Sequence, residues 1–202
     1  MKSIQIAIDG PSGAGKSTMA KLVSQKLGIM YLDTGAMYRA LALKAIRQNI
    51  DTNDSEKVSE LLSDFNISIK YEKGSQKVIL NGEDVSDKIR TDEVSMGASN
   101  VSAIPAVRKR LVELQQKMAS NTSVVMDGRD IGTHVLPNAD VKIFLTASVA
   151  QRALRRYNEQ KDKGILKKSL EEIEKEIEIR DYNDSHRAAS PLKQADDAVL
   201  LD

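Results

Sequence analysis

Short apolar runs and helical periodicities alternate over the first fifty positions of the chain. Residues 4–8 form an apolar, β-branched run that predicts a buried parallel strand. Apolar positions then recur every three or four residues over 16–27, which predicts a helix that ends at Gly28. A second strand is expected over 30–32 and a second helix over 35–48. This order of elements predicts the start of a doubly wound α/β fold.

The pattern changes to strict alternation in the middle of the chain. Residues 65–71 alternate between apolar and polar, which predicts a half-buried strand. A turn over 73–75, a strand over 77–80 and a hairpin-forming Asn-Gly pair follow. We interpret this stretch as a small antiparallel sheet, inserted over 50–90 into an α/β chain.

The α/β rhythm resumes after the insert. The elements expected there, in order, are helices over 92–102 and 106–119, strands over 124–127 and 141–145, helices over 148–162 and 169–183, and a strand over 198–201. The chain as a whole is therefore predicted to be a three-layer α/β fold around a central parallel sheet.

Composition and charge narrow the class of protein. The 202 residues are 41% hydrophobic and 29% charged, as in a soluble globular domain. The 30 basic and 29 acidic residues give a net charge of +1, which removes the long-range attraction typical of nucleic-acid binders. The absence of cysteine excludes disulfides, zinc-thiolate sites and cysteine nucleophiles. The amino terminus lacks the apolar core of a signal peptide and no apolar stretch approaches a membrane span, so we expect a cytoplasmic protein without a membrane partner. We also expect a monomer, and the charge balance predicts no nucleic-acid partner.

The strongest chemical motif lies between the first strand and the first helix. It matches G-x-x-x-x-G-K-[ST] and reads Gly10-Pro11-Ser12-Gly13-Ala14-Gly15-Lys16-Ser17-Thr18. The glycines let backbone N–H groups converge on phosphates at the amino end of the helix. Lys16 can reach the β- and γ-phosphates of a nucleotide, and the Ser17 hydroxyl can ligate Mg²⁺. The motif predicts a phosphate site.

A second motif begins where the strand over 124–127 ends. Asp127 resembles the strand-end carboxylate that lies near Mg²⁺ in phosphate-loop proteins, although an ordinary strand-end aspartate is the alternative. An arginine and a second aspartate follow in Gly128-Arg129-Asp130-Ile131-Gly132-Thr133. They lie where ligands bind in open α/β sheets, which favours a functional role.

A third motif also follows a strand and reads Asp33-Thr34-Gly35-Ala36-Met37-Tyr38-Arg39. Tyr38 and Arg39 lie one helical turn past Thr34. The Arg39 guanidinium could bind a second phosphate through two parallel hydrogen bonds. A helix cap with a surface arginine is the alternative interpretation.

An arginine cluster occupies one face of the helix expected over 148–162. Arg152, Arg155 and Arg156 have few acidic neighbours within one turn, and a flexible stretch over 161–164 follows them. This pattern is typical of a lid that carries arginines over a transferring phosphate. A solvated helix face is the alternative.

A second charged group is spaced i, i+4, i+7 near the end of the last expected helix. Arg180, Asp184 and Arg187 share one face if the helix extends that far, and an internal ion pair is the alternative explanation. His134 and His186 have no partner at metal-ligand spacing, so we interpret both as structural.

Together the motifs resemble those of the bacterial cytidylate kinases, a family of nucleoside-monophosphate kinases, over essentially the whole chain. The phosphate loop alone fits many families. The motifs at 33–39 and 127–133, in this order and with a β-rich insert between them, are specific to this family. Pro191-Leu192 and Ala195-Asp196 also match its pattern near the carboxyl end.

The resemblance implies a division of the chain into three parts. These are a phosphate-loop core over 1–49, 91–148 and 166–202, a monophosphate-binding β/α insert over 50–90 and a helical lid over 149–165. The family also has a helix after the last strand, which would lie beyond Asp202, where the given sequence ends.

The resemblance also implies a role for each candidate residue. Residues 10–18 would hold ATP, and Ser17 and Asp127 would ligate its Mg²⁺. The groups that would stabilise the transferring phosphoryl are Lys16, Arg129, Arg152 and Arg156. The residues implied for the CMP site are Thr34, Tyr38, Arg39, Ser99, Arg108, Arg129, Asp130, Arg180, Asp184 and Arg187. Within that set, Ser99, Arg108 and Asp130 would contact the cytosine edge.

The expected activity is phosphoryl transfer from MgATP to CMP or dCMP, directly in line and without a covalent enzyme intermediate. Another acceptor, such as UMP, AMP or a small metabolite alcohol, is an alternative within the kinases. A nucleotide switch is the alternative outside them, but the Asn-Lys-x-Asp sequence typical of guanine recognition does not occur.

Overall fold

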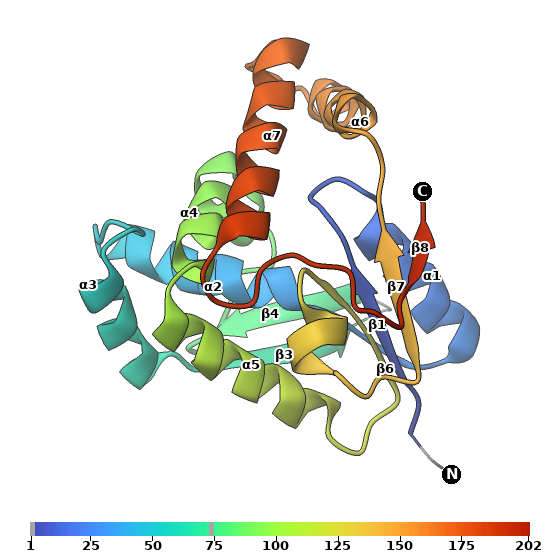
Figure 1. Ribbon diagram of the computed structural model, residues 1–202. Helices are drawn as coiled ribbons and strands as arrows, with labels where there is room; N and C mark the ends of the chain where they lie inside the picture. The colour runs from blue at the N-terminus through green and yellow to red at the C-terminus, as the bar shows by residue number, and fades with distance from the viewer. Residues whose placement is uncertain (1–2, 73–74) are drawn as a thin grey trace.

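A five-stranded parallel sheet forms the centre of the molecule (Figure 1). The computed structural model describes residues 3–72 and 75–202. The strands, in their order across the sheet, are β2 (Met30–Asp33), β6 (Val124–Gly128), β1 (Gln5–Asp9), β7 (Val141–Leu145) and β8 (Val199–Leu201). Asp33 is in register with Asp127, and Asp9 with Gly128. The three sequence motifs therefore meet at one edge of the sheet, which is where ligands bind in this class of fold.

Alternating side chains of the strands face helices on the two sides of the sheet. Ile6 and Ile8 belong to a buried cluster with residues of α1 (Lys16–Leu27). Ala7 and Met126 point the other way, into a cluster with α5 (Pro105–Ala119) and the single π-helical turn η3 (Ile131–Val135). The predicted three-layer α/β architecture is confirmed.

The insert contains the expected antiparallel sheet, in the order β3–β4–β5. Its elements are α3 (Ser55–Glu60), η1 (Leu61–Asp64), β3 (Ile67–Glu72), β4 (Ser75–Leu80), β5 (Glu83–Asp84) and η2 (Lys88–Arg90). The predicted turn over 73–75 lies mostly outside the described residues. The sequence pattern did not locate the helical segments α3, η1 and η2, although the resemblance implied a β/α insert.

The insert shares one hydrophobic core with three helices of the main body. Val78 and Leu80 of β4 are buried in the same cluster as residues of α2 (Thr34–Arg47), α4 (Asp92–Ser102) and α5. Since α2 carries the third motif, packing fixes the insert beside that motif. The sequence pattern marked 50–90 as a separate unit, but its apolar face is completed by helices on both sides of it in the chain.

Two helices, α6 (Val149–Asp162) and α7 (Leu170–His186), stand away from the sheet (Figure 1). They pack together through a small cluster that includes Ala153, Ile173 and Ile177. Helix α7 begins at the predicted capping box of Ser169 and Glu172 and continues three residues past its predicted end. That extension places Asp184 within the helix.

The chain after α7 crosses back beneath the helices to reach β8 (Figure 1). The Lys142 ammonium ties this segment to the sheet, since it donates to the Pro137 carbonyl at 2.6 Å and pairs with Asp197 at 2.8 Å. Val199 and Leu200 of β8 are 59% and 54% exposed. Within the described ranges, no helix is long and apolar enough to cross a membrane.

Candidate active site

The loop between β1 and α1 has the backbone of a phosphate cradle. Gly10, Gly13 and Gly15 have φ values of 147°, 78° and 100°. At Gly10 a side chain is impossible, because a Cβ would lie 1.9 Å from the Leu145 carbonyl oxygen. No side chain caps the amino end of α1. Its N–H groups therefore face the loop, ready for an anion.

Lys16 is buried in this loop, with 5% of its surface exposed. Its ammonium donates to the Pro11 carbonyl at 2.6 Å. Burial, and next the neighbouring Arg129, lower the pKa of Lys16 below its ordinary value. An ammonium has three donors, so donors remain for a phosphate oxygen beside that carbonyl.

The two predicted Mg²⁺ ligands are in contact. Ser17 Oγ donates to Asp127 Oδ2 at 2.7 Å, and the Tyr31 hydroxyl donates to Asp127 Oδ1 at 2.9 Å. The pKa of Asp127 is raised, first by burial and next by the nearby Asp33. A cation at this point would stabilise the ionised form of this buried carboxylate. Among the described residues no cluster of three or more His, Cys, Asp or Glu could hold a metal. A hydroxyl and one carboxylate suit Mg²⁺, which keeps waters and takes further oxygens from phosphates.

The third motif forms a charged cluster around Asp33. The Arg39 and Arg90 guanidinium groups lie 2.7 and 3.2 Å from Asp33 Oδ2. Burial alone would raise the pKa of Asp33, but the two arginines outweigh it and hold that pKa below its ordinary value. The helix cap of the alternative interpretation is present, since Asp33 Oδ1 accepts from the Ala36 amide at 3.0 Å, but the Arg39 side chain is only 16% exposed and is not a surface arginine. Thr34 Oγ1 donates to the Asp127 carbonyl at 2.8 Å, which joins this motif to β6.

Asp184 of α7 pairs with the second motif rather than with its own helix. The Arg129 Nε donates to Asp184 Oδ2 at 2.9 Å, whereas Arg187 lies 3.9 Å from the other oxygen. Burial, and next Arg129, lower the pKa of Arg180 to about 10. The internal Arg180–Asp184–Arg187 ion pair considered from spacing is thus only part of the arrangement. Asp184 is an ion-pair partner of Arg129 and Arg187, and Arg187 also lies 3.7 Å from Asp130. The positive charge of Arg180 adds to this group and helps to lower the pKa of Asp184, so the three arginines outnumber the two carboxylates and leave a net positive charge for an anion.

The residues implied for base contact meet deeper in the same region. Arg108 donates to Asp130 in an ion pair whose side chains are 4% and 7% exposed. The Arg108 guanidinium also lies 5.6 Å from the centre of the Tyr38 ring. Burial raises the pKa of Tyr38 to about 12, so its hydroxyl remains a donor at neutral pH.

Ser99 reaches this group only through a neighbour. Ser102 Oγ donates to the Ser99 carbonyl at 2.8 Å, and Arg108 Nη1 donates to the Ser102 carbonyl at 3.3 Å. The Ser99 residue is half-buried on α4. Among the described residues these bonds connect only the Ser99 backbone to Arg108, and the place of the Ser99 hydroxyl at the base stays a prediction.

The arginines of α6 have partners that were not apparent from sequence. Arg152 is buried; it donates to the Ser12 carbonyl at 3.0 Å and pairs with Asp181 of α7 at 2.6 Å. Arg156 pairs with Asp92 of α4 at 2.7 Å. The acidic partners come from other elements, so the local scarcity of acids did not leave these two cations unpaired. Arg152 ties the phosphate loop to both helices.

Three residues at this edge of the sheet carried no role in the sequence interpretation. Tyr31 and Arg90 lie outside the motifs, and only the folded chain brings them to Asp127 and Asp33. Asp9 ends β1 directly before the phosphate loop, and its position at a strand end was the available signal.

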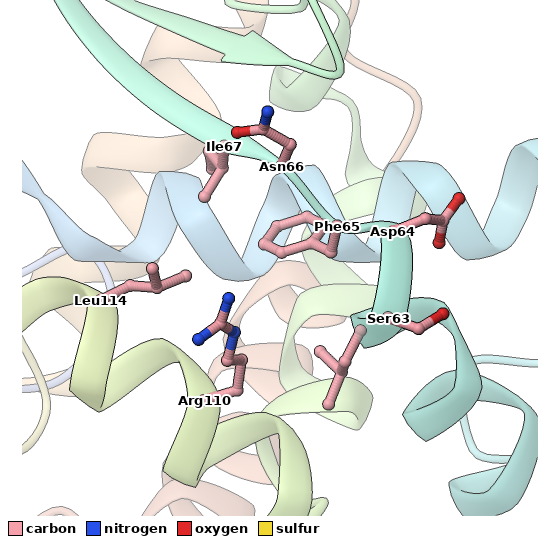
Figure 2. Close-up of a pocket in the computed structure, with 8 residues that line it drawn as sticks. Ser63, Asp64, Phe65, Asn66, Ile67, Arg110 and Leu114 are labelled. Atoms are coloured by element: carbon pink, nitrogen blue, oxygen red, sulfur yellow. The ribbon is translucent and has the colours of Figure 1, made fainter.

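Two cavities accompany the site. One of about 640 Å³ lies behind the phosphate loop and is lined by loop residues, by apolar side chains of α1 and by Thr18 and Arg155. The other, of about 270 Å³, lies between α5 and the segment that runs from η1 to the start of β3 (Figure 2). Figure 2 shows Arg110 of α5 beneath Phe65 there, and the cavity shares no residue with the three motifs.

Comparison with known proteins agrees with this geometry. The cytidylate kinase family profile matches residues 6–202. A cytidylate kinase from Ligilactobacillus salivarius is 57% identical over 202 residues, which cover 100% of this chain and 90% of the relative. Another from Lactobacillus johnsonii is 54% identical and covers 98% and 86%. One from Caldicellulosiruptor saccharolyticus is 53% identical and covers 100% and 89%. The chain is a member of the cytidylate kinase family.

Proposed function

We propose that this nucleotide kinase transfers the γ-phosphoryl group of MgATP to CMP or dCMP, giving ADP and CDP or dCDP. One observation carries the proposal: several buried arginine donors around the Asp33, Asp130 and Asp184 carboxylates have no hydrogen-bond partner among the described residues. They are Arg39 Nε, Arg108 Nε, Arg180 Nε and Arg187 Nη2. A buried donor without a partner is costly, so such a cluster indicates a ligand with several acceptor oxygens.

The acceptor phosphate would bind among Arg39, Arg129 and Arg180. Two of these arginines are held by carboxylates, Arg39 by Asp33 at 2.7 Å and Arg129 by Asp184 at 2.9 Å. A phosphate dianion accepts the same forked hydrogen bonds as a carboxylate and carries more charge. The phosphate of the acceptor would therefore form hydrogen bonds with guanidinium groups that the carboxylates already hold in place and that are already removed from water.

The base would bind at the Arg108–Asp130 pair. Cytosine presents an amino donor where uracil presents a carbonyl acceptor. The Asp130 carboxylate accepts from an amino group but repels a carbonyl oxygen, and Arg108 can donate to the cytosine ring carbonyl. A site that leaves buried polar groups unpaired rejects the wrong base. This chemistry favours CMP over UMP.

The donor nucleotide would place its phosphates in the loop over 10–18. Ser17 and Asp127 would hold Mg²⁺, which neutralises charge on the ATP phosphates when it is bound. The cavity of about 640 Å³ behind the loop would take the adenine ring against apolar side chains, with Arg155 at its edge.

Transfer would be a direct displacement. An acceptor phosphate oxygen attacks the γ-phosphorus, and the bond from that phosphorus to the bridging oxygen of ADP breaks. No base is needed, because the acceptor oxygen is already ionised. Lys16 and Arg129 would stabilise charge on the transferring group, while Arg152 and Arg156 of α6 would position the phosphate loop and the closing helix.

We also propose that residues 50–90 serve the acceptor and that residues 149–165 act as a lid. The insert reaches the acceptor motif directly, since Gln76 of β4 accepts from the Asp33 amide at 3.0 Å and Arg90 pairs with the Asp33 carboxylate. Closure of both parts would exclude the water that otherwise hydrolyses ATP.

Product analysis tests the proposal. The protein, MgATP and CMP should give CDP and ADP in equal amounts, and mass spectrometry should find no phosphorylated enzyme. The Lys21→Ala variant, changed at an exposed position of α1, is the matched control for a Lys16→Ala variant that makes no CDP. ADP formed without CDP would contradict phosphoryl transfer to the nucleotide.

A further inference from the structure

Asp9 adjoins the phosphate loop in sequence, yet its carboxylate binds the opposite side of the site. Its Oδ1 accepts from the Ile131 amide at 2.8 Å, and its Oδ2 accepts from the Gly132 amide at 2.7 Å. The residue is 4% exposed. These two amides directly follow Asp130, the residue placed at the base. One carboxylate therefore spans from β1 to the turn that leaves the neighbouring strand β6.

Within residues 3–72 and 75–202, Asp9 is the hydrogen-bond partner of the first two amides of this turn. Asp130 is the residue before η3, and its side chain makes no capping bond to that turn. It is instead engaged with Arg108. The first amides of a helical turn have no partner within the turn, and buried amides need one. Asp9 supplies both acceptors and leaves the Asp130 side chain free to point at the arginine.

The contact is also closely packed. A Cβ added at Gly132 would lie 3.4 Å from Asp9 Oδ2 and 3.1 Å from Lys142 Cδ. The tighter of these contacts is with the Lys142 side chain, so the turn is packed between that side chain and the Asp9 carboxylate. A shift of the turn would move Arg129 and Asp130 together, since both belong to the same short connection between β6 and η3.

We infer that Asp9 is a positioning residue for acceptor recognition: it holds the turn that presents Arg129 and Asp130 to the acceptor nucleotide. The inference rests on the proposed function of this site. Sequence adjacency to the phosphate loop would instead predict a role in binding ATP. Among the described residues, however, the Asp9 carboxylate makes hydrogen bonds only to Ile131 and Gly132.

Steady-state kinetics of Asp9→Asn separates the two roles. Asparagine keeps the shape and one acceptor but turns an NH₂ group toward one of the two amides, so one bond becomes a repulsion. We expect the KM for CMP to rise about tenfold, the range of a lost charge-assisted hydrogen bond, with the KM for ATP changed less than about twofold. The preference for CMP over UMP in kcat/KM should fall.

Asp140→Asn is the matched control. Asp140 accepts from the Gln5 amide at 2.9 Å, so it performs the same kind of backbone contact at the other end of β1. It is exposed and distant in the strand from the site. Neither KM should change in this variant, and melting temperatures of both variants show whether they fold.

The outcomes are distinct. An Asp9→Asn variant that raises the KM for ATP as much as that for CMP, or changes neither KM, would overturn the inference. If Asp9→Asn does not fold, Asp9→Glu keeps the charge but moves the carboxylate by one methylene relative to the Ile131 and Gly132 amides, and it should raise the KM for CMP selectively. An unchanged KM for CMP in that variant would overturn the inference. A wild-type protein that does not phosphorylate CMP would instead refute the proposed function.

Discussion

Replacing Asp130 by asparagine separates base recognition from catalysis. Asp130 and Arg108 form an ion pair with side chains 7% and 4% exposed, and Arg187 lies 3.7 Å from the second carboxylate oxygen. Asparagine keeps the size of the side chain and one acceptor oxygen but removes its charge. Two buried guanidinium groups then lose their shared counterion.

Because the pair is buried, both the loss of stability and the loss of base discrimination should be large. Breaking a buried ion pair from one side costs about 3–5 kcal/mol of folding stability. Because asparagine can still accept from Arg108 and because Asp184 faces Arg187, we take the lower value, about 3 kcal/mol. For a domain of this length that corresponds to a melting temperature lower by about 6–12 °C. Loss of a charge-assisted contact to the base is worth about 1.5–3 kcal/mol, or about 10–100-fold in discrimination.

The assay compares initial rates with CMP and UMP, together with thermal melts. We expect the CMP-to-UMP ratio of kcat/KM to fall at least about tenfold, while kcat with CMP falls less than that. Asp140→Asn serves again as the exposed control. A lower melting temperature with unchanged discrimination would mean that the pair only stabilises the fold, and the assignment of Asp130 to the base would be wrong.

Three further predictions concern the donor loop, the acceptor arginine and pH. Lys16→Ala should abolish turnover without unfolding the protein. A rate near that of Lys21→Ala would show that the assignment of Lys16 to the phosphate site is wrong. Arg39→Ala should weaken CMP binding in calorimetry by about tenfold or more and leave ATP binding unchanged, whereas exposed Arg110→Ala should affect neither; equal losses for both nucleotides would place Arg39 on the donor side. Burial raises the pKa of Asp9 from 3.8 to about 6, so the folded protein binds the Asp9 proton more tightly than the unfolded chain does. The stability that this proton contributes is lost as the pH rises from 3.8 through about 6. In urea unfolding, the free energy of unfolding of Asp9→Asn relative to that of wild type should therefore rise by up to about 3 kcal/mol between about pH 4 and pH 7. A difference that does not change with pH would contradict the raised pKa of Asp9.

Features encoded by short spacings could be predicted from the sequence. The phosphate loop, its helix and the strand-end Asp127 follow from local patterns, and the structure brings Ser17 and Asp127 into contact. The antiparallel insert followed from alternation and a turn-forming pair. In each case a few consecutive residues contain the whole physical signal.

Features that depend on pairing across the chain could not be predicted. Spacing offered Asp184 ion-pair partners near its own helix as the alternative interpretation, but its closest ion-pair partner is Arg129, 55 residues earlier. The arginines of α6 lacked local counterions, yet Asp181 and Asp92 approach from two other helices. Side-chain spacing specifies which residues share a helix face, but tertiary packing decides what that face meets.

The most direct test of the account is ADP release from MgATP with each nucleoside monophosphate offered in turn, beside a reaction without acceptor. The account predicts fast release with CMP and dCMP, slower release with UMP, negligible release with AMP and almost none without acceptor. Release at the same rate with every monophosphate and without any would contradict it, because ATP would then be hydrolysed without use of the arginine cluster.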